Sequence, residues 1–219
     1  METDRSVKQY REKLKGVLYA ILLLNAGLTS AQQNYDTFEG ERFVSYFTPK
    51  HWGKLDTLAA NPAPDSVNNS ARCASYKRSR QRYDYIKIYP SVKMTDVDKY
   101  ATYDESAPKM KMKVYSTAPV GSLIEIQMGK KTGNAYPEGT HSQFQAFTKT
   151  TNQWEEVEFK YSQTPKGSET RAKDVDQMTL LFMPGTNSTY QFYFDELTGP
   201  SLLSDQSAKA SRKKSRIFN

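Results

Sequence analysis

Alternation of apolar and polar side chains constrains the fold of this sequence more than any other feature. In "KMKMKVY", Met110, Met112 and Val114 alternate with lysines, and in "WEEVEFKY", Val157 and Phe159 alternate with charged residues. The segments "YDYIKIYP", "SLIEIQM", "DQMTLLFMP" and "YQFYFDEL" repeat the pattern. A period of two residues is that of a β-strand with one buried face. We therefore expect each of these segments to be a strand.

Turn-forming segments separate these strands, among them "STAPVGS", "KKTGNAYPEGT" and "MPGTNST". Gly, Pro and Asn favour turns and interrupt strands. We also expect "DTLAANPAPDSVNNSARC", residues 56–73, to be one long loop, because its prolines and asparagines preclude a regular strand across it. About eight to ten short strands joined by such loops predict an all-β fold, an antiparallel β-sandwich of the jelly-roll type.

The first 31 residues differ from the rest. A basic segment, the apolar run "VLYAILLLNAGL" and the small residues "TSA" follow one another, as in a secretory signal. The apolar run is shorter than the ~20 residues that span a bilayer, although an uncleaved anchor is the alternative. We predict a signal peptide over residues 1–31, a β-sandwich domain over 32–200 and a disordered basic tail over 201–219. The protein would be secreted, periplasmic or on the cell surface, with no stable membrane insertion after cleavage.

Charge and cysteine content narrow the possible partners. The whole chain has a formal net charge of +7, but residues 32–204 hold 21 Lys/Arg and 20 Asp/Glu. A nearly neutral domain does not favour nucleic acid as a partner. Cys73 is the only cysteine, which excludes an intramolecular disulfide and a cysteine-built metal site. We expect Cys73 to fill space in the core.

Residue patterns that carry catalysis are missing from the sequence. His51 and His141 are the two histidines, and no HxxxH, Gly-rich phosphate loop or GxSxG occurs. Ser142 follows His141, but neighbours on a strand point to opposite faces, so we expect no nucleophile–base pair there. No pair of carboxylates shares the apolar setting that would raise one pKa for glycoside hydrolysis. The sequence therefore predicts a protein that is not an enzyme.

One predicted strand carries a polar row. In "HSQFQAF", His141, Gln143 and Gln145 share one face, while Phe144 and Ala146 share the other. Buried amides need hydrogen-bond partners. This face is therefore either solvated or part of a site that reads hydroxyl groups.

Other side chains can complete such a site. Glu125 and Gln127 would extend the row if their strand is a neighbour. Aromatic rings stack on sugar rings, and Trp52, Tyr85 and Tyr136 are the candidate platforms. Trp52 lies in the turn-like "TPKHWGKLD", whereas Trp154 opens a strand and is expected in the core.

Several segments together resemble a known family. The opening "NYDTFEGERF", the closing "YFDELTGP" and, between them, "NPAPDSVNNSARCASYKR", "KMKVYSTAPVGSLIEIQMG" and "AYPEGTHSQFQAFT" are similar in order and spacing to secreted bacterial carbohydrate-binding modules. The likeness covers residues 35–200 and is to the β-jelly-roll families numbered 4, 11 and 22. It implies a polysaccharide or oligosaccharide ligand. It also implies a catalytic partner protein, since such modules usually belong to larger chains.

The resemblance also implies a structural calcium ion. In such modules, the glutamate of the Phe-Glu-Gly opening and the aspartate that closes the last strand bind calcium together with backbone carbonyls. The matching residues are Glu39 and Asp195. Calcium takes six to eight oxygen ligands, so two carboxylates and several carbonyls suit it. The alternative is that both carboxylates are solvated.

The leading hypothesis is therefore an exported, non-catalytic carbohydrate-binding module that holds a polysaccharide on one sheet face. Its expected site residues are Trp52, Tyr85, Glu125, Gln127, Tyr136, His141 and Gln143. One alternative is a structural or adhesive sandwich without a glycan ligand. Another is a polysaccharide lyase, because the "Tyr…His…Gln" order faintly resembles alginate lyases, although their Gln-Ile-His triplet and Arg-rich strand are absent.

Overall fold

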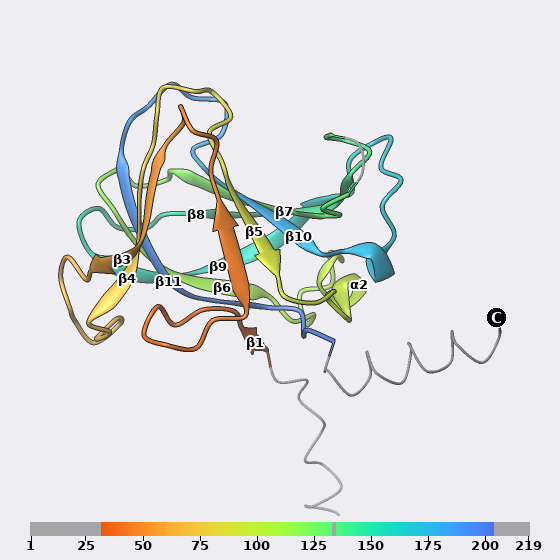
Figure 1. Cartoon of the computed structure of the whole chain (residues 1–219), viewed down its shortest axis with the longest axis horizontal. Helices are drawn as coiled ribbons and strands as arrows, with labels where there is room; N and C mark the ends of the chain where they lie inside the picture. Colours follow the sequence, from red (N-terminus) through yellow and green to blue (C-terminus); the bar gives the residue numbers. More distant parts are fainter. Residues whose placement is uncertain (1–31, 133–134, 204–219) are drawn as a thin grey trace, which may run out of the picture. The chain divides into compact units, whose positions relative to one another are not determined.

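The computed structural model describes residues 32–132 and 135–203 (Figure 1). The predicted signal peptide and the tail from residue 204 lie outside the described residues. The described part contains two short helical elements, α2 (Val97–Tyr100) and the 3-10 helix η1 (Ala172–Asp174). Neither is long and apolar enough to cross a membrane, and the same holds throughout the described residues.

The strands form two antiparallel sheets (Figure 1). The first sheet has the spatial order β3 (Lys54–Ala60), β4 (Arg72–Lys77), β11 (Gln191–Gly199), β6 (Met110–Ser116) and the first part of β9 (Trp154–Gln163), with β1 (Gln33–Asn34) paired to the end of β11. The second sheet has the order β2 (Val44–Phe47), β5 (Ile86–Pro90), β10 (Gln177–Phe182), β7 (Leu123–Gly129), β8 (Thr140–Phe147) and the last part of β9.

Strand β9 belongs to both sheets. Its residues 154–159 pair with β6, whereas residues 160–163 pair with β8. The hydrogen-bonded pairing of strands therefore continues through β9 from one sheet into the other, although the two sheets form separate layers. This arrangement is an antiparallel β-sandwich of the jelly-roll type, and the predicted fold class is confirmed.

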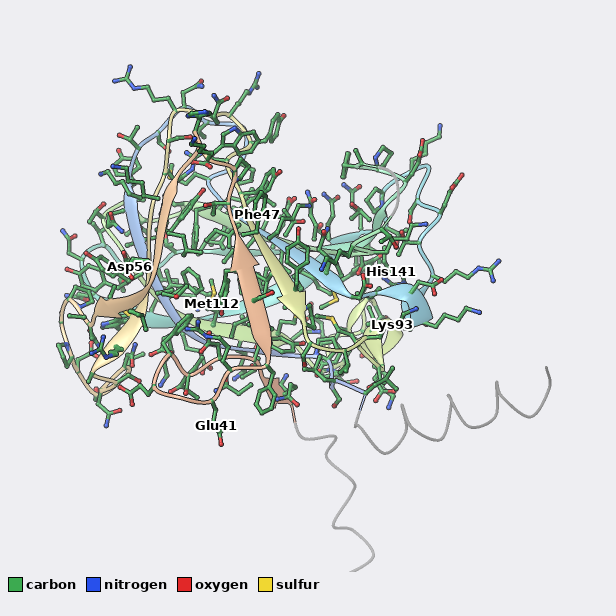
Figure 2. All side chains as sticks on the ribbon, viewed as in Figure 1. Glu41, Phe47, Asp56, Lys93, Met112 and His141 are labelled. Atoms are coloured by element: carbon green, nitrogen blue, oxygen red, sulfur yellow. The ribbon has the colours of Figure 1, made fainter. Side chains whose placement is uncertain are left out.

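The core lies between the two sheets. Met112 and Ile126, from opposite sheets, are completely buried, and Met112 lies in the interior in Figure 2. Phe182 of β10 stacks on Phe192 of β11 with ring centroids 4.3 Å apart. Each such side chain contributes about 1.5–3 kcal/mol by its removal from water. Cys73 is also completely buried, as expected, and burial raises the pKa of its thiol to about 12.

The predicted long loop is shorter than expected. The prediction of a loop over residues 56–73 was wrong at both ends, because β3 runs to Ala60 and β4 begins at Arg72. The loop covers residues 61–71, which contain all the prolines and asparagines of the segment. Strand β3 shows only a weak apolar alternation because it is an edge strand, held by its backbone pairing to β4.

The two ends of the domain meet directly. Gln33 pairs with Gly199, and the Tyr35 hydroxyl donates a hydrogen bond to the Pro200 carbonyl over 2.7 Å. The Leu203 N–H donates to the Lys93 carbonyl, so the chain stays bonded to the domain three residues beyond the predicted boundary at residue 200. Backbone pairing thus joins the first and last strands.

Candidate functional site

The outer face of the second sheet carries the predicted polar row. Since Ile124, Ile126 and Phe144 belong to the core, the residues that alternate with them point away from it. We call this surface the outer face. It consists of Phe47, Tyr85, Lys87, Tyr89, Leu123, Glu125, Gln127, Gln143, Gln145, Phe147, Gln163, Thr179 and Leu181.

Strand register aligns part of the outer face into one transverse row. Neighbouring partners run from β2 to β9 in the order Phe47, Lys87, Thr179, Gln127, Gln143 and Gln163. Strands in a sheet lie ~4.8 Å apart, so the row extends roughly 24 Å across the strands. An extended ligand that crosses the strands would meet each of these positions in turn.

Glu125 organises the polar half of the outer face. Its Oε1 accepts hydrogen bonds from the Nε2 atoms of Gln127 and Gln143, over 2.8 and 3.1 Å, and its Oε2 accepts one from Gln145 over 2.9 Å. We call these four residues the amide cluster. Glu125 is only 8% exposed and Gln143 only 5%, although both point away from the core. The Gln163 side-chain Nε2 donates in turn to the side-chain Oε1 of Gln143 over 2.6 Å.

The amide cluster presents hydrogen-bond acceptors. A carboxylate only accepts hydrogen bonds, so each amide must turn its NH₂ group toward Glu125 and its carbonyl oxygen away. The side-chain amide oxygens (Oε1) of Gln127 and Gln145 accept no hydrogen bond from any described residue. These free acceptors suit a ligand rich in hydroxyl donors.

Aromatic rings lie on the β5 side of the outer face, separated from the amide cluster by strand β10. Trp52 packs edge-on against Tyr85, with ring centroids 4.7 Å apart. The Lys87 ammonium lies 5.0 Å from the Tyr85 centroid and donates to the Thr179 hydroxyl over 2.8 Å. Burial lowers the pKa of Lys87. The structure therefore brings Trp52 and Tyr85 together, but Tyr85 is partly covered by its two neighbours.

A buried carboxylate holds the segment that carries Trp52. Asp84 is completely buried and accepts hydrogen bonds from the Gly53 N–H over 3.1 Å and from the Tyr76 hydroxyl over 2.5 Å. A Cβ atom at position 53 would overlap the Tyr76 ring, so this close approach requires glycine. Trp52 is thus fixed next to Tyr85 through its neighbour Gly53.

His141 departs from the expected geometry. Its Nδ1 lies 3.0 Å from the Ser142 Oγ, and its Nε2 lies 3.2 Å from an Asp98 carboxylate oxygen of α2. The prediction that His141 and Ser142 could not meet was wrong, because the pairing with β7 shifts by one residue at the start of β8 and breaks the alternation. Ser142 is completely buried, so this contact offers no nucleophile to a substrate.

The environment of His141 also affects its charge. Burial lowers the pKa of His141, while the Asp98 carboxylate opposes that effect. His141 lies at the β8 start, where Figure 2 labels it. Its ring is engaged by Asp98 and Ser142 rather than by the amide cluster.

The remaining predicted residue stands apart. Tyr136 lies on the β7–β8 loop, is 55% exposed and makes no hydrogen bond or ring contact with the other predicted site residues. Glu125, Gln127 and Gln143 therefore form the centre, and Trp52 with Tyr85 form one border. Sequence reasoning missed Phe47, Lys87 and Thr179. Alternation could have placed Lys87 outward, but only the register aligns it with the glutamines.

The predicted calcium ligands both contact one segment, residues 68–72. Asp195 is completely buried; it accepts hydrogen bonds from Asn68 Nδ2 over 3.1 Å and from the Glu196 N–H over 2.8 Å. Glu39 is exposed and accepts from the N–H groups of Ala71 and Arg72. Burial raises the pKa of Asp195 to about 6. Among the described residues, no three His, Cys, Asp or Glu side chains group together as a metal site.

A strand irregularity gives Asp195 its position. The register between β11 and β6 shifts after Asp195, and Glu196 takes a left-handed φ of 47°. Glu196 then points to Lys113, with 2.8 Å between the charged atoms. The Glu196 carboxylate therefore forms an ion pair with Lys113, while its backbone N–H remains bonded to Asp195.

Comparison with known proteins shows similarity of fold to several solved structures. No protein-family model and no curated protein matches the chain. A family 11 carbohydrate-binding module of a cellulosomal cellulase from Clostridium thermocellum is 12% identical, with a TM-score of 0.48, and the alignment covers 80% of this chain and 98% of that one. A family 11 module from the same organism in complex with a β-1,3-1,4-mixed-linked tetrasaccharide is also 12% identical, with a TM-score of 0.48, and the coverage is 79% and 98%.

An enzyme also contains a similar domain. An arabinose-bound α-L-arabinofuranosidase is 12% identical, with a TM-score of 0.51, and the alignment covers 82% of this chain but 29% of that one. At these identities the likeness concerns the fold alone. The β-sandwich fold of this chain is therefore similar to that of one part of the α-L-arabinofuranosidase.

Proposed function

We propose that this protein is an exported, non-catalytic carbohydrate-binding module that holds a polysaccharide across the outer face of the second sheet. The observation that carries the proposal is the amide cluster, in which a carboxylate that is 8% exposed holds three amides with two carbonyl oxygens left for a ligand. Sugar hydroxyls are donors that match these acceptors. The Trp52–Tyr85 pair, on the other side of strand β10, adds apolar surface for a sugar ring.

The same face argues against catalysis by this domain. Glycoside hydrolysis uses two carboxylates on either side of the scissile bond, whereas the outer face as defined has one, Glu125. A lyase must neutralise the carboxylate of a uronate, and Glu125 would repel it instead. A polysaccharide-degrading partner protein would therefore supply the chemistry while this domain supplies retention on the substrate.

Affinity electrophoresis tests the proposal. The described domain would be run through gels containing a mixed-linked β-1,3-1,4-glucan, a xylan, a mannan or alginate. We expect at least one neutral polysaccharide to retard it and Gln143→Ala to reduce that retardation at unchanged thermal stability. Equal migration in all gels would favour a structural or adhesive sandwich. New ultraviolet absorbance from unsaturated ends on alginate would favour the lyase.

We also propose that calcium binds at Glu39 and Asp195, with backbone carbonyls completing its shell. Asp195 supports this, because it is completely buried and forms no ion pair with any described lysine or arginine. A bound cation would keep its carboxylate ionised. Glu39 contacts the same segment, residues 68–72, and two carboxylates with neutral oxygens form a donor set that suits calcium. Chelation with EDTA should then lower the melting temperature.

A further inference from the structure

A cavity opens where the two sheets separate. The pairing of β8 with β9 ends at Gln145 and Lys160, because the earlier residues of β9 pair with β6 instead. Continued register would place Phe147 opposite Glu158 and Lys149 opposite Glu156. The strands diverge at this point, so these pairs face each other across a gap.

This seam cavity has a volume of about 550 Å³. One wall is formed by Gln145, Phe147 and Lys149, and the other by Glu156, Glu158 and Lys160. Small-molecule sites commonly have volumes of ~300–1,000 Å³, so the seam cavity is large enough for one or two sugar rings.

The walls of the seam cavity combine an apolar ring with polar groups. The Phe147 side chain is 55% exposed. Glu156 pairs with Lys111 over 2.9 Å, and the Lys149 ammonium forms no ion pair with a described residue. A sugar presents an apolar ring face together with hydroxyl groups that both donate and accept. The composition of the seam cavity matches that chemistry.

An added peptide strand fits the seam less well. A peptide that extends a sheet needs unpaired backbone groups along an edge. Here the Glu155 carboxylate accepts hydrogen bonds from the N–H of Lys149 over 2.9 and 3.0 Å and from the N–H of Thr150 over 3.0 Å. Those edge donors are already used, which leaves the side chains as the recognition groups.

Gln145 connects the seam cavity to the amide cluster. Its Nε2 donates to Glu125, and the same residue lines the seam cavity. We propose that the seam cavity is an additional subsite for the same polysaccharide, in which Phe147 stacks on a sugar ring and Lys149 and Glu158 bind its hydroxyls. This inference rests on the proposed function. It adds that the bound chain continues past β8 to the boundary between the two sheets.

Binding as a function of oligosaccharide length tests the seam subsite. The neutral polysaccharide that binds wild type best in the gel panel would supply oligosaccharides of increasing length for calorimetric titration. We expect Phe147→Ala to weaken binding of the long oligosaccharides about five- to tenfold and to leave the shortest measurable ligand unaffected. Phe147→Trp should retain long-chain binding. Tyr190→Ala, which removes a 36% exposed aromatic on the loop before β11, is the matched control.

Each outcome separates the two proposals. Retained binding of every length by Phe147→Ala would overturn the seam subsite while the proposed function stands. Equal weakening at every length would also overturn it, because Phe147 would then act at the amide cluster. A change in oligomeric state without a change in glycan affinity would assign the seam to a second copy of the chain. Failure of wild type to bind any panel member would overturn both proposals.

Discussion

The outer faces of the two sheets use the same residue types in opposite ways. On the first sheet, Trp154, Tyr115 and Tyr193 form a transverse row through the β9, β6 and β11 register. Their rings meet at steep angles of 59° and 85°, and the Trp154 Nε1 donates to Asn61 of the covering loop over 2.9 Å. Trp154 is 3% exposed, as expected for a structural residue.

The second sheet leaves two acceptors without a partner among the described residues and leaves its aromatic residues partly exposed. Trp52 and Tyr85 lie on the same face as the amide cluster, on the other side of strand β10. Each face also carries one buried carboxylate. Asp195 accepts hydrogen bonds from Asn68, Ser70 and the Glu196 N–H, whereas Glu125 accepts from three amides, and the side-chain oxygens of two of them, Gln127 and Gln145, are left without a partner among the described residues. The two faces therefore differ less in their aromatic residues than in whether the polar groups of the same face have protein partners.

Removal of Trp154 should have the largest effect, and on stability alone. Trp154→Ala leaves a cavity under the loop and deprives Asn61 of a donor, so we expect the free energy of unfolding to fall by about 3–5 kcal/mol. Urea denaturation measures this change. Glycan affinity of the folded fraction should match wild type. Lost affinity with unchanged stability would mean that the first sheet also binds the ligand.

Asp195 should govern the pH dependence of stability when calcium is absent. Its folded pKa of about 6 lies above the usual 3.8, so the folded state holds an extra proton between these values and stability falls as the pH rises through that window. We expect a contribution of about 2 kcal/mol, which the difference between wild type and Asp195→Asn isolates in EDTA. His141 contributes in the opposite direction, because its lowered pKa costs stability as the pH falls below about 6.5. This contribution is the same in both proteins, so it drops out of the difference between them.

Calcium should abolish that pH dependence in wild type, since a cation keeps the carboxylate ionised. Thermal unfolding across pH 4–8, with EDTA or with calcium, measures both effects. An identical melting temperature in EDTA and in calcium at pH 7 would end the calcium proposal. A difference between wild type and Asp195→Asn that stays constant with pH would contradict the buried-carboxylate argument.

Glu125→Gln should weaken glycan binding about tenfold or more, because the new amide cannot accept hydrogen bonds from three neighbouring amides and the acceptor pattern is lost. Isothermal titration on the best panel polysaccharide measures it. Glu41→Gln is the control, since that residue is exposed on the loop before β2 and lies outside both the outer face and the seam cavity. A variant that binds as tightly as wild type would show that the amide cluster does not contact the ligand.

Trp52→Ala should have the smallest effect, a three- to tenfold weaker affinity with less than about 1 kcal/mol of lost stability. The same titration and urea measurements apply. Tyr83→Ala, which removes a 58% exposed ring from a nearby loop position, serves as its control. If Trp52→Ala destabilised the fold as much as Trp154→Ala, the contrast between the two faces would disappear.

Strand alternation predicted much of the candidate site. It placed Glu125 and Gln127 on one side of β7 and His141, Gln143 and Gln145 on one side of β8, since side-chain direction in a strand follows from local geometry. It could not show that Glu125 collects three amides, because that depends on the β7–β8 register. It also erred at His141, where a one-residue shift in pairing brings Ser142 into contact.

The sequence by itself determined the strands with a clear apolar alternation and, except at His141, the side chains that they turn toward the core, because both follow from local conformational preference and the period of the strand. Only the tertiary structure decided which strands are neighbours. The Lys87–Thr179 contact joins residues 92 positions apart, and the seam cavity exists because β9 changes partners midway. Such contacts arise from the packing and pairing of distant strands, which no local pattern of residues specifies.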